Sequence, residues 1–197
     1  MSTSSEHDDQ TFLITPMKNL FLLAAAALLL TSPAPSLRAD DAESIKVSEF
    51  TFTYDKPWVR QQVASAMRAG QFVYDHEAED LVDVELVIFF FGVGQGGGTQ
   101  ANIDRWIGQF EGTPEAKTEV KEMGGKKITL LTAKGTYLES MGGPFSGNKT
   151  PKPDYTMLAA ILPSEQGDVF LKLTGPTKSV EAMGDAFLKF AQSPFAE

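Results

Sequence analysis

The sequence has no cysteine and only two histidines among its 197 residues. It can therefore form neither disulfides nor a lipid anchor on a lipobox thiol, so its core alone must stabilise it. His76 is the single imidazole after position 39, and no G-x-S-x-G motif occurs. A zinc site with several histidines and a triad-type nucleophile thus have no support. Paired carboxylates are available, but nothing singles out one pair.

Basic residues are also scarce. Residues 40–197 hold 23 Asp and Glu against 15 Lys and Arg, a net charge of −8. Such a surface repels phosphate backbones and anionic lipids, and no basic stripe is visible. We therefore expect no nucleic-acid partner, and the acidity otherwise indicates only solubility.

No apolar run is long enough to cross a membrane. The longest is Leu20–Leu30, which would span roughly 16 Å as a helix, about half of a hydrocarbon core. Lys18 precedes it and Ala39 stands before an acidic segment, as in a cleavable signal peptide. We expect cleavage after Ala39 and export to the periplasm or the medium, with no transmembrane anchor after cleavage.

The first 16 residues fit a leader poorly, because they are polar and include Glu6, Asp8 and Asp9. Met17 is therefore a candidate for the true start. Residues 1–39 are predicted to be upstream sequence plus signal peptide, and residues 40–197 a single domain. A domain of that size buries about 70% of its unfolded surface, enough for a real core.

Several segments alternate or cluster apolar residues as strands do. Alternation over 47–54 predicts a half-buried strand that Pro57-Trp58 ends. After a loop or short turn, a second strand is expected from about Ala66 to Tyr74. Val84–Phe91 is, apart from Glu85, a continuous apolar run, typical of a central strand.

Two hairpins are predicted further along. The first joins strands over 118–123 and 126–137 through Gly124-Gly125, and the second joins 155–162 and 168–174 around Gln166-Gly167. Residues 140–154 are rich in glycine and proline and are predicted to be one long loop, either functional or unstructured.

Two helices are expected, each with one apolar face. The first begins near Thr99, and its stripe is Ile103, Trp106, Ile107 and Phe110. The second would be capped by Thr177 or Ser179 and stopped by Ser193-Pro194. Its buried face would consist of Val180, Met183, Phe187 and Phe190.

Hairpins make neighbouring strands antiparallel, and two one-faced helices can cover the two faces of one sheet. The sequence therefore predicts an α+β fold, an α/β/α sandwich around a largely antiparallel sheet of about six or seven strands.

The most distinctive segment is 84–110. An apolar strand runs into the turn Gly92-Val-Gly-Gln-Gly-Gly-Gly98 and then into a helix with Asn102-Ile-Asp-Arg-Trp-Ile-Gly-Gln-Phe110. Phe170-Leu-Lys-Leu-Thr-Gly-Pro176 later precedes the final helix. In this order, over residues 45–193, the chain resembles the superfamily of the PsbP extrinsic subunit of photosystem II and the Mog-type Ran-binding proteins, and more closely its uncharacterised exported bacterial members.

The resemblance implies this fold and a habit of non-catalytic binding to larger assemblies. The ligand sites of the photosynthetic members map onto no identifiable residues here, and a fold analogy by itself names no role.

The glycine turn permits several interpretations. It matches G-x-G-x-x-G from Gly92, but further βαβ units and the acidic residue of a dinucleotide site are missing. Alternatively, the N–H groups of Gly96, Gly97 and Gly98 could form an anion nest at the helix N-terminus, with Arg105 nearby. We expect instead that the glycines only permit a sharp turn at positive φ.

Asn102, Arg105 and Gln109 share one side of the first helix. They could form a recognition face for a ligand or partner. We favour a structural role, in which they hydrogen-bond neighbouring loops and hold the helix on the sheet, because their side chains suit loop carbonyls.

Asp75, His76, Glu77, Glu79 and Asp80 form the one acidic cluster with a histidine. They could hold Ca²⁺ or another divalent metal. However, the spacing lacks the glycine and final glutamate of an EF-hand loop, and one histidine is too few for catalytic zinc. We expect a solvated loop and no cofactor.

Three functions follow as hypotheses. The leading one is an exported, non-catalytic binding or accessory domain that docks on a protein partner or an envelope assembly, through the 140–154 loop and the Gly94–Gly98 turn. The second is a carrier of a small molecule or metal ion, and the third is an enzyme whose site the sequence hides. A convergent polar pocket with perturbed acids would favour the enzyme, and a flat exposed apolar patch would favour docking. The sequence does not specify an oligomeric state.

Overall fold

The computed structural model describes residues 42–63, 65–140 and 149–196. The predicted leader, its cleavage site and the candidate start at Met17 lie outside these residues, as does the part of the predicted loop at 141–148. Among the described residues, no helix combines the length and the apolar character needed to cross a membrane.

Strands account for most of the described chain. In chain order they are β1 (Glu43–Val47), β2 (Phe50–Tyr54), β3 (Trp58–Arg60), β4 (Arg68–Tyr74), β5 (Val84–Phe90), β6 (Glu115–Met123), β7 (Lys126–Ser140), β8 (Lys149–Leu162) and β9 (Val169–Pro176). The helical elements are α1 (Thr99–Ile107), α2 (Thr177–Ala182), α3 (Gly184–Gln192) and the 3-10 helix η1 (Ser193–Phe195).

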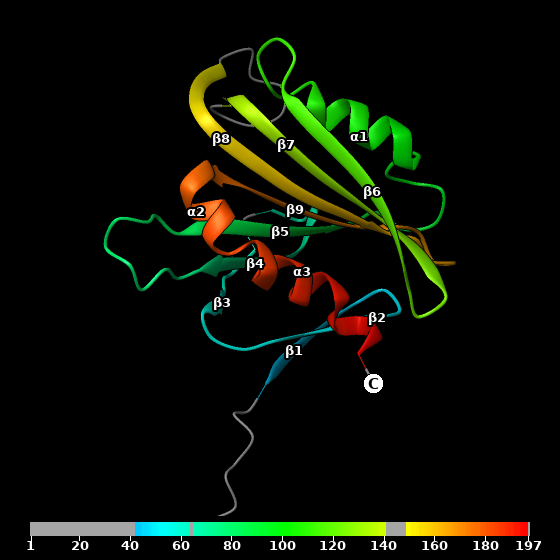
Figure 1. Ribbon diagram of the computed structural model, residues 1–197. Coiled ribbons are helices and arrows are strands. Elements are labelled where there is room, and N and C mark those ends of the chain that lie inside the picture. Colours follow the sequence, from blue (N-terminus) through cyan, green and yellow to red (C-terminus); the bar gives the residue numbers. More distant parts are fainter. Residues whose placement is uncertain (1–41, 64, 141–148, 197) are drawn as a thin grey trace, which may run out of the picture. The chain divides into compact units, whose positions relative to one another are not determined.

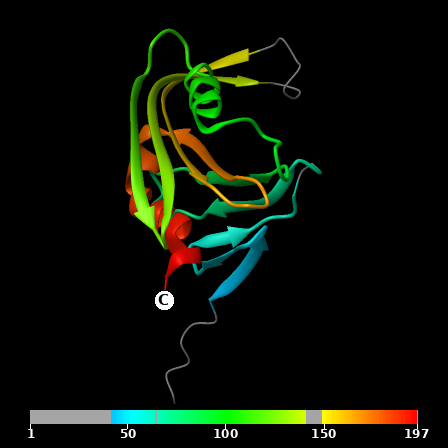
Figure 2. The ribbon, with the colours of Figure 1, turned by 90° about the vertical axis from the view of Figure 1, so that its right-hand side faces the viewer.

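Seven strands form one sheet in the order β3-β4-β5-β9-β8-β7-β6 (Figure 1), while β1 and β2 pair separately. All of these pairings are antiparallel. Helix α1 lies on one side of the main sheet and the C-terminal helices lie on the other (Figure 2). The predicted α+β sandwich is thus confirmed, with seven strands in its main sheet. The β1–β2 hairpin is not part of that sheet.

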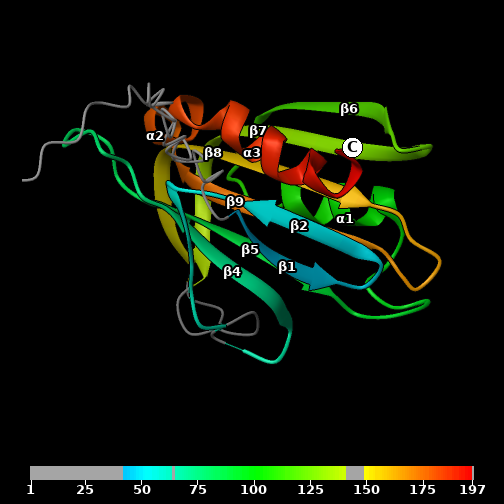
Figure 3. The same cartoon turned by 90° about the horizontal axis from the view of Figure 1, so that it is seen from below.

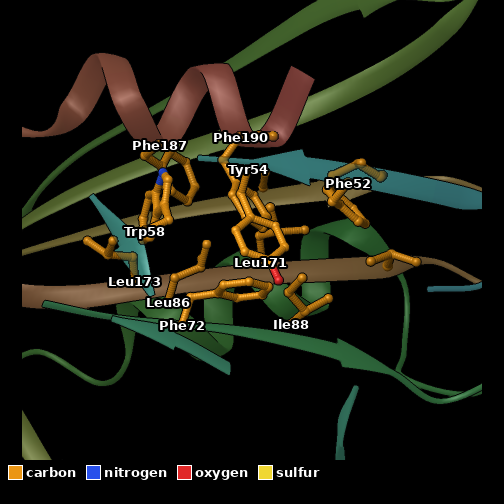
Figure 4. Close-up of a cluster of buried hydrophobic side chains, with 14 of the residues drawn as sticks. Phe52, Tyr54, Trp58, Phe72, Leu86, Ile88, Leu171, Leu173, Phe187 and Phe190 are labelled. Carbon is orange, nitrogen blue, oxygen red and sulfur yellow. The ribbon is translucent and has the colours of Figure 1, made fainter. Parts of the chain in front are cut away.

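The larger core lies between the main sheet and the layer made by α3 and the β1–β2 hairpin. Helix α3 runs alongside β2 (Figure 3), and its Phe190 stacks on Phe52 of β2 with ring centroids 5.5 Å apart. On the sheet side, Phe190 meets Phe72 edge to face at 5.0 Å. Leu171 and Leu173 of β9 point into the same cluster (Figure 4). Burying these side chains in contact with one another supplies the main stabilising free energy of the fold.

A smaller core lies on the opposite face of the sheet, under α1. Its helix side is Ile103, Trp106 and the following Phe110, all buried as predicted. They pack on alternate residues of β7 and β8 and on Phe170 of β9. Because α1 is only nine residues long, it covers this face in part.

The predicted loop over 140–154 is wrong at its C-terminal part, since 149–154 belong to β8. Pro151 and Pro153 made a strand look implausible there. However, β9 ends opposite Tyr155, so this part of β8 pairs with β7 alone, and an open edge needs no N–H donor from proline. A register shift between Gly135 and Tyr137 accommodates the irregular backbone near Pro153.

Two further predictions are corrected. The residues after Pro57 form the short strand β3, because Trp58 pairs with Tyr74 of β4. The single predicted C-terminal helix is divided at Met183 and continues past Ser193 as η1.

Neither predicted capping residue caps the C-terminal helix. Instead, the Thr177 hydroxyl lies 2.9 Å from that of Thr156, and Ser179 Oγ accepts from the Val82 N–H at 2.9 Å. The predicted buried face of this segment is confirmed for all four residues, Val180, Met183, Phe187 and Phe190.

Candidate functional site

A polar pocket lies on the face of the sheet that α1 covers only in part. Successive side chains of a strand point to opposite faces, so Phe170, Lys172 and Thr174 of β9 share this one. Phe170 packs under Trp106 of α1, with ring centroids 6.3 Å apart. Lys172 and Thr174 instead line an open pocket of about 360 Å³, here called the Lys172 pocket.

Five adjacent strands contribute to the Lys172 pocket. Its lining residues are Arg68 of β4, Glu85, Val87 and Phe89 of β5, Lys172 and Thr174 of β9, Tyr155 of β8, and Tyr137, Glu139 and Ser140 of β7. Neighbouring strands are about 4.8 Å apart. The sheet therefore brings together charged and aromatic groups that are distant in the sequence.

The ammonium of Lys172 is held by neutral groups. Its Nζ donates to Gln109 Oε1 at 2.5 Å and to the Tyr137 hydroxyl oxygen at 3.2 Å, and it lies 5.3 Å from the centre of the Tyr137 ring. Among the described residues it forms no ion pair with a carboxylate. Burial, followed by the positive charges of Arg105 and Arg68, lowers the pKa of Lys172 to about 8.

The two carboxylates that line the pocket are both engaged elsewhere. Glu85 accepts from Arg68 Nη1 at 2.7 Å and from Gln71 Nε2 at 3.0 Å. Glu139 pairs with Lys152 at 3.4 Å. In the part of the chain that the structure describes, the positive charge of Lys172 is therefore left without a matching negative charge.

Tyr137 and Tyr155 form an aromatic wall of the Lys172 pocket, and the Thr174 hydroxyl beside them has no hydrogen-bond partner among the described residues. The rings of Tyr137 and Tyr155 stack with centroids 6.3 Å apart and an interplanar angle of 5°. Burial, and then the charge of Glu139, raises the pKa of Tyr137. Thr174 Oγ1 is buried without a hydrogen-bond partner among the described residues. A ligand with an apolar body and a polar group would satisfy all of these features.

The three predicted helix residues have different places. Gln109 contacts Lys172 directly, as described above. Arg105 is exposed and donates to Asn102 Oδ1. Asn102 is 1% exposed, and its Nδ2 donates to the carbonyls of Gly96, Gly97 and Gly98 at 2.9, 3.3 and 3.0 Å. Asn102 thus ties the glycine turn to α1, whereas Gln109 belongs to the Lys172 pocket.

The glycine turn itself offers little to an anion. Gly96 and Gly97 have φ of 87° and 80°, which accords with the expected sharp turn. Gly97 and Gly98 line a separate hollow whose opposite wall carries Glu165 and Asp168. These carboxylates would repel an anion at that position.

The acidic cluster is not gathered around a point. Within the described ranges, no three His, Asp or Glu residues are placed to share a metal ion. Asp80 pairs with Lys178. The hydrogen bond from Lys178, followed by its positive charge, lowers the pKa of the Asp80 carboxyl. The His76 ring packs on Tyr74 with centroids 5.0 Å apart, and its backbone N–H donates to Asp83. Asp80 is thus engaged by Lys178, and His76 packs on Tyr74 with its Nε2 buried and without a hydrogen-bond partner among the described residues.

A metal titration checks this conclusion. We expect millimolar CaCl₂ or ZnCl₂ to leave the melting temperature where NaCl of equal ionic strength leaves it, because no preformed cage supplies binding free energy to the folded state. Differential scanning fluorimetry with EDTA as a control gives the answer. A rise specific to Ca²⁺ that disappears in Asp75→Asn would reinstate the metal site.

Sequence reasoning missed the main residues of the pocket, namely Lys172, Thr174, Tyr137, Tyr155, Arg68 and Glu85. A lysine between leucines in a strand has the pattern of any solvent-facing residue. The one available signal was that the apolar residues of β9 are typical of a central strand. A lysine on such a strand is surrounded by side chains of the strands on either side.

Comparison with known proteins finds similar solved structures but assigns neither a family nor a site. No protein-family model matches the sequence, and no curated protein matches it. Among solved structures, the chain is similar to cyanobacterial PsbP (CyanoP) from Synechocystis, with 13% identity, a TM-score of 0.48, and coverage of 83% of this chain and 96% of that one.

Two other solved structures are comparably similar. LpqN of Mycobacterium tuberculosis, involved in cell envelope biogenesis, has 14% identity and a TM-score of 0.47, with 78% of this chain and 83% of that chain covered. The Pseudomonas aeruginosa protein PA94 has 10% identity and a TM-score of 0.45, with 79% and 97% covered. A PsbP protein is thus among these three and a Mog-type protein is not. At such identities and TM-scores the likeness assigns neither a site residue nor a function.

Proposed function

We propose that the chain is an exported, non-catalytic binding domain and that the Lys172 pocket is its binding site. The observation that supports this most directly is that, among the described residues, the Lys172 ammonium has no counter-charge and the nearby Thr174 hydroxyl has no hydrogen-bond partner. Buried polar groups are normally satisfied, and an unpaired enclosed charge is costly. A pocket that leaves both open is suited to an occupant that supplies the missing partners.

The contents of the pocket argue for binding rather than catalysis. No imidazole lines it, and Glu85 and Glu139 each already accept from a cation. General acid–base and nucleophilic catalysis need a base within hydrogen-bond reach of a nucleophile or of the substrate's proton. With a pKa of about 8, Lys172 is mainly an ammonium at neutral pH, where it donates to Gln109 and Tyr137 and does not act as a base. The pocket can therefore hold and orient an occupant without an evident means of transforming it.

The position of the pocket fits an accessory role. Glu139 and Ser140 at its rim are the last residues of β7, so an occupant would also contact the end of the β7–β8 pair. A partner protein could insert one side chain or chain end into the pocket and pack along this rim. We further propose, on the basis of the predicted signal peptide, that this event occurs outside the cytoplasm and that the partner is an envelope assembly.

Site-specific crosslinking tests the proposal. A photoreactive phenylalanine analogue at Ser140, exposed at the pocket rim, is expected to give a defined adduct in intact cells that export the protein. The control position is Val120 of β6, which is 61% exposed and does not line the pocket. Adducts at Ser140 that vanish in Lys172→Met support the proposal. Equal adducts at both positions, or none at Ser140, would contradict it.

A further inference from the structure

We infer that the occupant of the Lys172 pocket presents a single carboxylate next to a flat apolar or aromatic body. This inference rests on the proposed function, because it names the ligand chemistry of the same site. It follows from three features of the pocket: the sign and size of its uncompensated charge, the donors that remain free, and the surfaces beside them.

Of the charged groups that line the pocket, Lys172 is the one without a partner of opposite charge among the described residues. Arg68 is matched by Glu85, and Glu139 is matched by Lys152, so the ion pairs at the rim cancel. Lys172 remains, with Arg105 close enough to affect its protonation. A monoanion would neutralise Lys172. A dianion such as a phosphate monoester would bring a second negative charge beside the two lining glutamates, and Arg105, which is exposed and outside the lining, would offset only part of that repulsion.

The free donors suit the two oxygens of a carboxylate. An ammonium has three N–H groups, and Lys172 uses one for Gln109 and one for Tyr137. The third N–H and the Thr174 hydroxyl are available on the same face of β9. Residues two apart on a strand lie about 7 Å from each other, so one carboxylate between them could accept from both. Charge-assisted hydrogen bonds of this kind are among the stronger ones in proteins.

The surfaces beside these donors are flat and apolar. Tyr137 and Tyr155 present stacked rings on one side, and Val87 and Phe89 line the pocket on the other. A volume of about 360 Å³ lies in the lower range of small-molecule sites. An aromatic or branched aliphatic group next to the carboxylate would bury apolar area against these walls.

A carboxylate of this kind has two possible sources. It could belong to a free aromatic acid, or it could be the C-terminal carboxylate of a partner protein whose last residue is apolar. Both require the same contacts with Lys172 and Thr174, and only the second extends along the β7 rim.

The test uses benzoate as the probe and benzyl alcohol as its uncharged counterpart. In the exported protein with ¹³C,¹⁵N-labelled lysine, benzoate is expected to bind in the millimolar range and to raise the pKa of Lys172, because an anion favours the ammonium form. Benzyl alcohol is expected to leave that pKa unchanged. Lys172→Met should weaken benzoate binding by about tenfold or more, the effect of losing one charge-assisted hydrogen bond.

A matched control separates local from general charge effects. Lys134 lies on the opposite face of the sheet and pairs with Glu181 of α2 at 3.2 Å. Lys134→Met removes the same charge from the chain and is expected to leave benzoate binding intact. Backbone amide spectra of both variants establish that each is folded before binding is compared.

Two peptides identify the source of the carboxylate. One ends in a free C-terminal phenylalanine and the other in its amide. Tighter binding of the free acid than of benzoate, lost in the amide, indicates a partner's C-terminus; binding of benzoate alone indicates a small acid. Equal response to benzoate and benzyl alcohol, or no response of Lys172 to any of these probes, would overturn the inference. If adducts at Ser140 still form in that case, only the ligand chemistry is wrong, whereas their absence removes the proposed function as well.

Discussion

Replacing Lys172 with methionine is expected to make the protein more stable, by about 1–2 kcal/mol at pH 7. The reason is that Lys172 carries an enclosed charge without a carboxylate partner, and methionine has a similar length and no charge. The loss of the hydrogen bonds to Gln109 and Tyr137 offsets part of the gain. For a chain of this size the melting temperature should rise by several degrees. A residue whose removal stabilises the fold is retained for another reason, and binding is the one proposed.

The same residue predicts how stability depends on pH. The pKa of Lys172 is about 8 when folded, against an ordinary value of 10.5. Below pH 8, Lys172 is charged in the folded and in the unfolded protein, and the folded state is destabilised because it encloses the charge. As the pH rises from 8 to 10.5, the folded state loses its proton first, so the unfolded state binds more protons and stability increases. The full change is about 3 kcal/mol, from 1.36 kcal/mol per pH unit.

Two tyrosines limit the pH range over which stability increases. Burial raises the pKa values of Tyr137 and Tyr54, so above about pH 10 the unfolded state deprotonates first and stability falls again. Urea unfolding of wild type and Lys172→Met between pH 7 and 10 therefore gives the cleanest comparison. The advantage of Lys172→Met should stay constant up to about pH 8 and then decline until it vanishes at about pH 9 to 10, because only wild type gains stability above pH 8. A constant difference would show that the Lys172 ammonium is well solvated and that the pocket does not enclose it.

Asn102→Ala is expected to destabilise the protein by about 2–4 kcal/mol. The side chain is buried, its amide donates to three carbonyls of the glycine turn, and its oxygen accepts from Arg105. Alanine would leave these groups without partners at the start of α1. Because α1 covers the smaller core, the loss should spread to Trp106, and its fluorescence should shift to the red as the helix loosens.

Two further variants make this result specific. Gln100→Ala removes an exposed hydrogen bond to Asp104 on the same helix and should change stability by less than about 0.5 kcal/mol. Asn102→Asp keeps the size but turns an acceptor toward three carbonyl oxygens, so it should also destabilise. If instead both Asn102 variants melt like the wild type and lose binding in cells, Asn102 is a recognition residue and the structural role is wrong.

The contrast between the fold and the pocket shows what a sequence reveals by itself. Hairpin glycines at 124 and 125, the apolar run of β5 and the stripe with Trp106 each fix local structure, and these local choices suffice for the antiparallel sandwich. Pro151 and Pro153 led to the wrong prediction of a loop. A strand accepts proline where it has a neighbouring strand on one side only, and that depends on the whole sheet.

The pocket was harder to foresee because it depends on where a helix stops. Alternation places Lys172 on the face opposite Leu171, but it does not say whether that face is covered, solvated or enclosed. Lys172 is enclosed for two reasons that lie outside its own strand. Helix α1 is too short to cover this part of the sheet, and Tyr137 of β7 lies against the lysine side chain. Gln109 was identified on the helix pattern, although its partner Lys172 is 63 residues away.

The order of strands in the main sheet has a consequence for how the chain reaches its final state. β9 lies between β5 and β8, yet among the described strands it is synthesised last. Until it arrives, β3-β4-β5 and β6-β7-β8 are two separate halves with apolar, unpaired edges. A chain whose halves cannot join before this segment is complete would stay open during synthesis, which would suit the proposed export of this protein before it folds.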